Sequence, residues 1–167
     1  LEPIECYVDV VGLPKDTKGY VFDSPFPKRN SKIIICRGVS TALNKRSSLM
    51  YRKLSTKIAE AVNSTPINTG VFAASYDVLD GLIDAGLKDL LPKPLFVEES
   101  ESTSARNDNL IELFRRGALN GGGVLLGVQG GRNSEGLDLP GDLLSTVVVV
   151  GVPYARPTPR VAASIDY

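Results

Sequence analysis

The sequence predicts an α/β domain with a mostly parallel sheet and helices on both faces. Five short apolar runs typical of strands are separated by segments in which apolar residues recur every three or four positions, as on one face of a helix. The runs are continuously apolar, which indicates strands that are buried on both faces. At 167 residues the chain has the size of one domain with a single core.

The expected strands are rich in β-branched residues and are bounded by turn residues. In chain order they are residues 32–36 (KIIIC), 70–74 (GVFAA), 94–98 (PLFVE), 124–127 (VLLG) and 146–150 (TVVVV). We expect the KIIIC run to be a short buried strand. The residues before it contain four prolines, and residues 1–30 therefore form an irregular lead-in segment in this interpretation.

Three helices are expected between these strands, around residues 50–62, 78–90 and 110–118. In the first, apolar residues from Met50 to Val62 recur at helical spacing and place one face inward. Gly81 and Gly86 weaken the pattern of the second helix. A run of three glycines after Asn120 ends the third.

Right-handed crossovers would place the carboxyl ends of all strands along one edge of the sheet, where open α/β sheets bind ligands. Three segments leave strands there: Ser75-Tyr76, the loop that begins at Gln129, and Pro153-Tyr154. Ser75 also suits the N-cap of the next helix, and Tyr76 can simply cover the edge of the core.

Composition excludes several function classes. Nineteen Lys and Arg balance nineteen Asp and Glu, so no overall field indicates nucleic acid or a membrane, and DNA binding would need a local patch. The absence of histidine excludes histidine-dependent nucleophile systems and His-ligated zinc. Two cysteines are too few for a disulfide scaffold, and we expect no metal site, no membrane span and an intracellular protein, in cytoplasm or nucleus.

The loop GVQGGRNSEGLDLPGD, residues 127–142, is unusually rich in glycine and charge for a connection between strands. Gly130 and Gly131 allow close approach to a phosphate, and Arg132 can bind the same group. Glu135 and Asp138 would share one face if the turn were helical. The alternative is an ordinary surface loop with local turn caps. No G-x-x-x-x-G-K-[ST] is present, so the chain lacks the usual triphosphate cradle.

Taken together, these segments carry a resemblance. The order SPFP at 24–27, then Arg46, GVFAASY at 70–76, VLLG at 124–127, GGRNSEGLD at 130–138 and VVGVPY at 149–154 resembles the second motor domain of XPD/Rad3 (DinG-like) superfamily 2 DNA helicases. The resemblance spans nearly the whole chain, and the SEGLD element with the trailing GVPY is its most specific part.

The resemblance implies a RecA-like (P-loop NTPase-type) domain over residues 31–167, truncated before the final helicase motif. In this family ATP and Mg²⁺ lie between two such domains, and the first domain supplies the phosphate loop and an iron–sulfur cluster. The implied partners are single-stranded DNA and that first motor domain. We expect no catalytic residue in this fragment alone, and 5′-to-3′ translocation and unwinding in DNA repair, including nucleotide excision repair, for the parent.

The same resemblance assigns site residues position by position. It implies DNA binding for Ser75, Tyr76, Gln129, Gly130, Gly131 and Arg132. It implies that Glu135, Gly136 and Asp138 border the nucleotide cleft, with Asp138 as the best candidate acceptor. The glycines would then let the loop approach DNA at one end and the ATP cleft at the other.

Two other interpretations are a stand-alone nucleotide- or protein-binding module without motor activity and a small hydrolase using Glu135 and Asp138. The hydrolase would need a second catalytic group at the strand edge. The chain starts without Met and ends in a helical pattern, which favours a piece of a larger helicase over the stand-alone module.

Overall fold

The computed structural model describes residues 4–154 and 158–166 and divides the chain into two compact units, Leu1–Ile35 and Cys36–Tyr167. The first unit contains the helix α1 (Ile4–Val11) and the 3-10 turn η1 (Lys28–Asn30), so the predicted irregular lead-in holds one short helix. Residues 1–3, 155–157 and 167 of the predicted segments lie outside the described residues.

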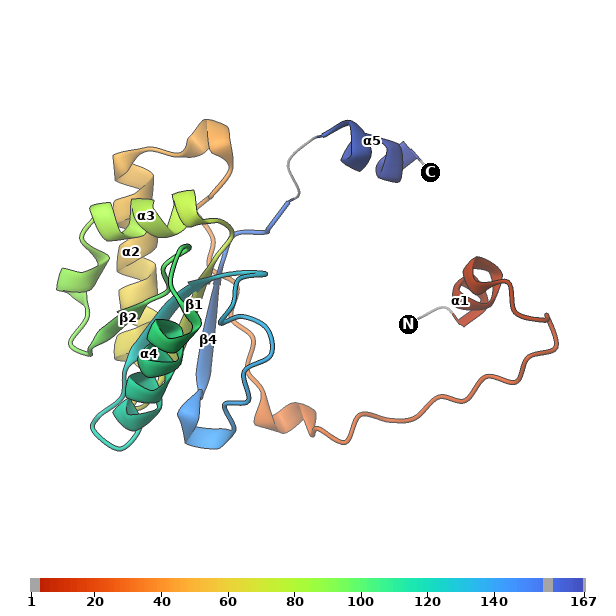
Figure 1. Cartoon of the computed structure of the whole chain (residues 1–167), viewed down its shortest axis with the longest axis horizontal. Coiled ribbons are helices and arrows are strands. Elements are labelled where there is room, and N and C mark those ends of the chain that lie inside the picture. Colours follow the sequence, from red (N-terminus) through yellow and green to blue (C-terminus); the bar gives the residue numbers. More distant parts are fainter. Residues whose placement is uncertain (1–3, 155–157, 167) are drawn as a thin grey trace. The chain divides into compact units, whose positions relative to one another are not determined.

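The second unit is built on a four-stranded sheet in which all strands are parallel (Figure 1). Its strands are β1 (Thr69–Ala73), β2 (Leu95–Val97), β3 (Val124–Val128) and β4 (Thr146–Val150), in the spatial order β2-β3-β1-β4. Four of the five predicted strands and the parallel α/β class are thereby confirmed. Parallel pairing directs every strand's carboxyl end to the same edge.

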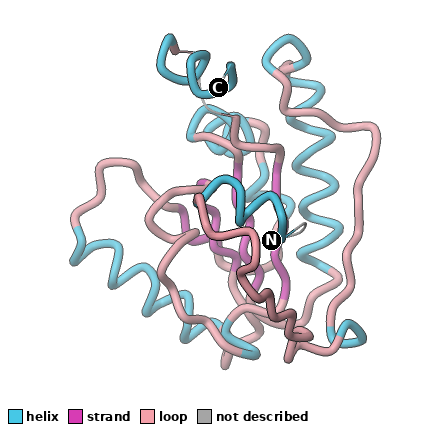
Figure 2. Tube along the Cα trace, turned by 90° about the vertical axis from the view of Figure 1, so that its right-hand side faces the viewer, coloured by secondary structure: helices cyan, strands magenta, loops and turns pink. Residues whose placement is uncertain are grey.

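Helices lie on both faces of this sheet (Figure 2). The expected burial on both faces is wrong for β4, because Val147 and Val149 are 52 and 64 % exposed. Helices α2 (Ser48–Asn63) and α3 (Tyr76–Asp84) pack with Val71, Ala73 and the even-numbered residues of β3. Helix α4 (Ser104–Gly117) packs with Phe72 and Leu125, which point to the other face. The remaining elements are η2 (Leu43–Lys45), η3 (Leu87–Leu90), η4 (Gly141–Leu143) and α5 (Pro159–Asp166).

Local hydrogen bonds and one glycine define the ends of these helices. The hydroxyls of Ser47 and Thr103 accept hydrogen bonds from Met50 N and Arg106 N at the starts of α2 and α4. The predicted helix over residues 78–90 is instead α3 followed by η3, because Gly86 adopts φ +80° and ends the first helix.

One predicted strand is wrong. Residues 32–36 form no strand, and the side chains of Ile33, Ile34 and Ile35 are 87, 72 and 81 % exposed. β-branched residues favour a strand only where a pleated surface and a neighbouring strand are available. The run lies at the border between the two units, and the four-stranded sheet of the described chain does not include it.

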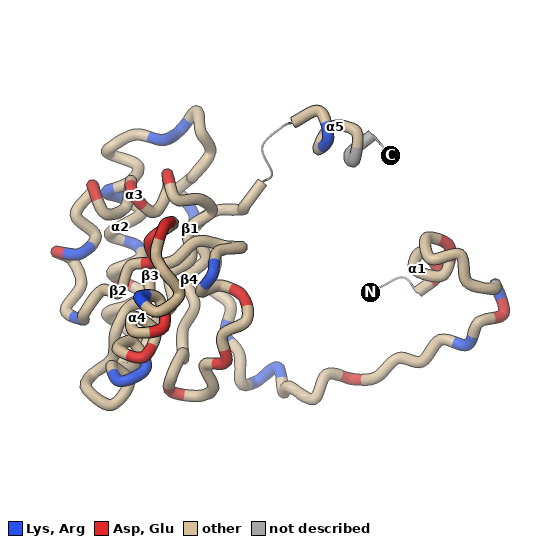
Figure 3. The backbone as a smooth tube through the Cα atoms, viewed as in Figure 1, with Lys and Arg blue, Asp and Glu red and all other residues tan. Residues whose placement is uncertain are grey.

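Charge is distributed over the surface with both signs on the same helices of the second unit (Figure 3). Within the described part of the chain, no helix is long and apolar enough to cross a membrane. Cys6 and Cys36 are free and exposed.

Candidate functional site

Gln129 forms hydrogen bonds that join the carboxyl ends of three strands. The family resemblance implies DNA binding for this residue. Its backbone N–H donates to the Ala73 carbonyl at 2.9 Å. Its side-chain Nε2 donates to the carbonyls of Phe72 (3.1 Å) and Gly151 (3.0 Å). Both side-chain amide hydrogens are therefore used within the fold, and Gln129 joins the ends of β1, β3 and β4.

Ser75 follows the end of β1 and caps α3. Its backbone is extended, and its hydroxyl accepts a hydrogen bond from Val78 N at 3.4 Å. The N-cap interpretation of this serine is thus confirmed, and the hydroxyl is half-buried at the strand edge.

Tyr76 is the first residue of α3, and its phenol meets a buried carboxylate. Tyr76 Oη donates to Glu98 Oε1 at 2.8 Å. Burial first, and then this hydrogen bond and the charge of Glu98, raise the pKa of Tyr76 to about 12. Tyr76 is thus held in its neutral, donating form at neutral pH.

Glu98 is a residue of this edge that sequence reasoning missed. It directly follows β2 and is only 3 % exposed. Besides the Tyr76 phenol, it accepts the backbone N–H of Asn133 at 3.1 Å through Oε2. The available signal was an acid closing an otherwise apolar strand, at the edge where ligands bind.

In the loop after β3, Arg132 lies between Gly131 and Asn133, which both contact Glu98. Gly130 has φ +73° with open space around it, so glycine is needed there for backbone conformation. Gly131 has no room for a Cβ, which would meet the Glu98 carboxylate and the Val128 carbonyl. Arg132 is exposed and donates from Nη1 to the Ser102 carbonyl at 3.1 Å. A guanidinium has five N–H donors, which leaves capacity for a phosphate.

Asn107 of α4 and Asn133 of the same loop form a pair that sequence reasoning did not identify. The side-chain amides of Asn107 and Asn133 exchange two hydrogen bonds, each of 2.9 Å, and both residues are buried. Because each amide supplies one donor and one acceptor to the other, both are satisfied away from water.

Glu135, Gly136 and Asp138, the predicted nucleotide-cleft residues, lie further along this loop and are exposed. The segment is a bend followed by irregular backbone, not a helix, so the helical condition for a shared carboxylate face is not met. Gly136 adopts φ +78°. The backbone is held near α4, since Leu137 and Leu139 pack on its apolar cluster and Arg115 Nη2 donates to the Asp138 carbonyl at 3.3 Å.

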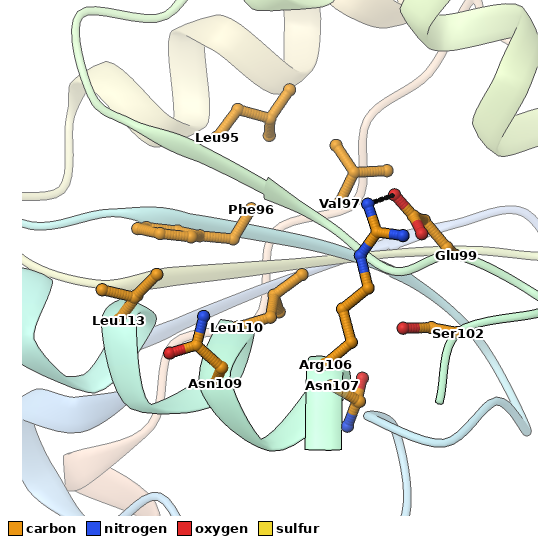
Figure 4. A pocket seen from close by; sticks show the side chains of 10 residues that line it. All are labelled: Leu95, Phe96, Val97, Glu99, Ser102, Arg106, Asn107, Asn109, Leu110 and Leu113. Carbon is orange, nitrogen blue, oxygen red and sulfur yellow. Dashed lines mark ion pairs between the residues drawn. The ribbon is translucent and has the colours of Figure 1, made fainter. Parts of the chain in front are cut away.

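A groove runs between β2 and α4, with an apolar floor and a charged rim (Figure 4). Leu95 and Phe96 line it from the strand, and Leu110 and Leu113 line it from the helix. Arg106 Nη2 and Glu99 Oε1 form an ion pair of 3.4 Å at its polar end. A second groove lies beside Tyr76 and Glu98 on the α3 side. The carboxyl end of β2 therefore borders two concave surfaces.

The parallel sheet with helices on both faces defines a RecA-like α/β domain. A family model described as "Helicase C-terminal domain" matches residues 58–167. The chain belongs to this helicase C-terminal domain family, and the resemblance to the second motor domain of XPD/Rad3-type helicases is confirmed.

Curated relatives support the same placement. The chain is 28% identical over 173 residues to "ATP-dependent DNA helicase CHL1" of Meyerozyma guilliermondii, covering 92% of this chain and 20% of that protein. It is 31% identical over 147 residues to "Probable ATP-dependent helicase MJ0942" of Methanocaldococcus jannaschii, covering 84% of this chain and 21% of that protein. The chain thus spans about a fifth of the length of these relatives.

Among solved structures, the chain is similar to one named "XPD_APO", with a TM-score of 0.58 and 24% identity over 77% of this chain and 25% of that one. A second, named "XPD_Helicase", gives a TM-score of 0.57 and 23% identity, covering 77% of this chain and 22% of the other. At these identities the similarity shows the fold, which is the RecA-like fold that the resemblance implies.

Proposed function

We propose that this chain is the second motor domain of an ATP-dependent DNA helicase of the XPD/Rad3 type. It contributes one side of an ATP and Mg²⁺ cleft and part of a single-stranded DNA track. The single observation that carries the proposal is the convergence of Ser75-Tyr76 and the Gln129–Arg132 segment at one sheet edge, in a chain of the helicase C-terminal domain family.

In this proposal Arg132 contacts the DNA backbone, and the glycines beside it let the strand approach the loop. Glu135, Gly136 and Asp138, exposed further along the same loop, face the nucleotide held by a first motor domain. That first domain supplies the phosphate loop and the iron–sulfur cluster. Closing of the two domains on ATP and their opening after hydrolysis would move the strand in the 5′-to-3′ direction. The parent acts inside the cell, in DNA repair.

The alternative is a stand-alone module that uses the same edge for a nucleotide or a protein partner. The two candidates differ in what the edge recognises, because a DNA track requires salt-dependent binding without sequence preference.

Titration of the chain with oligothymidylate, followed by fluorescence anisotropy at several salt concentrations, tests the DNA track. Replacing Arg132 with Ala removes one phosphate contact, so we expect weaker binding for every sequence and a log–log salt slope reduced by roughly 0.7. Arg116→Ala is the matched control, because Arg116 is exposed at the far end of α4 and pairs with Glu112.

Equal effects of the two substitutions would contradict a track at this edge. Absence of binding by the unaltered chain, together with binding of a nucleotide, would favour the stand-alone module.

A further inference from the structure

We propose that Glu98 is a positioning residue that couples the two candidate DNA-contacting segments, Ser75-Tyr76 and the loop at 129–134, through one buried carboxylate. The connection to DNA rests on the proposed function. The geometry of the carboxylate stands independently of it.

Glu98 is placed to hold both segments at once. One oxygen accepts the Tyr76 phenol from the start of α3 at 2.8 Å, and the other accepts the Asn133 backbone N–H at 3.1 Å. These partners lie 22 and 35 residues away in sequence. A carboxylate is the side chain that accepts two such donors without itself requiring an acceptor, and hydrogen bonds to a charged group are the stronger ones.

The loop is fixed on both sides of Arg132. At position 131 the glycine backbone packs directly against the Glu98 carboxylate, where a Cβ has no room. At position 133 the backbone is bound to Glu98 and the side chain to Asn107 of α4. The direction in which Arg132 leaves the loop is therefore set by its two neighbours.

A buried carboxyl group at this place is not what fold stability alone would select. Burying a carboxyl group carries a desolvation cost, and well-packed apolar replacements of buried ionic groups are often neutral or stabilising. Glu98 is 3 % exposed, and its hydrogen bonds join two separate segments of the ligand-binding edge. A ligand that displaces the Tyr76 hydroxyl would remove one of the two hydrogen bonds of Glu98 and loosen the loop. Binding at Tyr76 would thereby change the position of Arg132.

Amide hydrogen exchange measured by NMR on the 167-residue chain tests the coupling. In Glu98→Ala we expect exchange of the amides at 131–134 to rise about tenfold relative to those of β1 and β3, because a charged hydrogen bond to the loop is lost. Glu98→Gln should restore most of the protection, since its oxygen can accept from Asn133 N and its NH₂ can donate to Tyr76 Oη.

Two further variants separate coupling from a general loss of stability. Tyr76→Phe keeps the ring and removes only the hydroxyl that donates to Glu98, and it should still raise exchange at 131–134. Glu99→Ala is the matched control, because Glu99 is exposed and pairs with Arg106, and it should leave the loop unchanged. An equal rise in β1 and β3, or no effect of Tyr76→Phe on the loop, would overturn the proposal.

Oligothymidylate binding by the same variants distinguishes this inference from the proposed function. If both hold, Glu98→Ala weakens binding several-fold while Glu99→Ala does not. If the unaltered chain does not bind but the exchange pattern is as expected, the coupling stands and the DNA role is overturned. If Glu98→Ala loosens the loop and binds as tightly as the unaltered chain, the positioning role is overturned.

Discussion

At both ends of the sheet, single buried polar residues form hydrogen bonds that join separate segments of the chain. At the amino ends of the strands, Asn68 donates from Nδ2 to the carbonyls of Phe114 (2.8 Å) and Leu143 (3.2 Å) and accepts from Gly123 N at 2.8 Å. At the carboxyl ends, Glu98 and the Asn107–Asn133 pair hold the loop after β3. Each of these groups joins segments that are distant in sequence, and satisfying its donors and acceptors offsets the cost of its burial.

The Tyr76 phenol should titrate in an unusual range. Burial and the Glu98 hydrogen bond raise the pKa of Tyr76 from 10.0 to about 12. Between these pH values the folded chain keeps a proton that the unfolded chain has lost, so this contribution to the free energy of unfolding is complete below about pH 10 and is lost as pH rises to about 12. Tyrosinate absorbance of the unaltered chain minus that of Tyr76→Phe should therefore show a midpoint near 12.

Tyr20→Phe, at an exposed position, supplies the reference difference curve. A Tyr76 difference curve with a midpoint near 10, the ordinary tyrosine value, would show that the phenol is not engaged with Glu98.

At the scale of the elements, strand alternation divides the core between two faces. In β1, Val71 and Ala73 face α2 and α3, while Phe72 between them faces α4. Helix α4 covers its face with few large side chains, among them Phe114, whose ring meets Phe96 edge to face at 6.0 Å. The smaller cluster therefore depends strongly on single aromatic residues.

Two adjacent residues of α4, one buried and one exposed, should differ in how much their substitution by alanine lowers the free energy of unfolding in urea. Phe114 is 0 % exposed, so Phe114→Ala should lower the free energy of unfolding by about 4 kcal/mol through lost burial and a cavity. Leu113 is 45 % exposed at the groove, and Leu113→Ala should cost less than about 1 kcal/mol. Similar costs for the two substitutions would contradict the packing of α4 described above.

At the scale of the whole molecule, the chain consists of two units that differ in their number of buried residues. Every buried residue of the described chain belongs to Cys36–Tyr167, and none belongs to the described part of Leu1–Ile35. Burial of apolar surface is the dominant favourable term in folding, so stability resides in the larger unit.

A chain of residues 36–167 should fold on its own. We expect its free energy of unfolding in urea to match that of the 167-residue chain within about 0.5 kcal/mol, because none of the described residues that it lacks, 4–35, is buried. The comparison also includes the slope of the unfolding curve, which reports the surface exposed on unfolding. A clearly lower midpoint and slope would show that the apolar run at 32–35 is buried after all.

The sequence by itself determined much of this protein. Hydrophobic periodicity predicted β1 to β4, the three helices that cover them and the parallel sheet, because burial on one or both faces leaves a period that can be read directly. Ser75 was identified as a cap from local chemistry alone, and the order of the motifs identified the helicase family. The loop with Arg132 was placed at the correct edge because parallel strands end together.

Only the tertiary structure decided the rest. The run at 32–36 has the composition of a strand, yet strand formation depends on a neighbouring strand that composition does not specify. Glu98 looked like the last residue of a strand, since its partners Tyr76 and Asn133 lie 22 and 35 residues away. Periodicity indicates which face of an element is buried. The hydrogen bonds of one carboxylate to two segments depend instead on where separate elements pack against one another. That arrangement is set by the packing of the whole sheet and its helices.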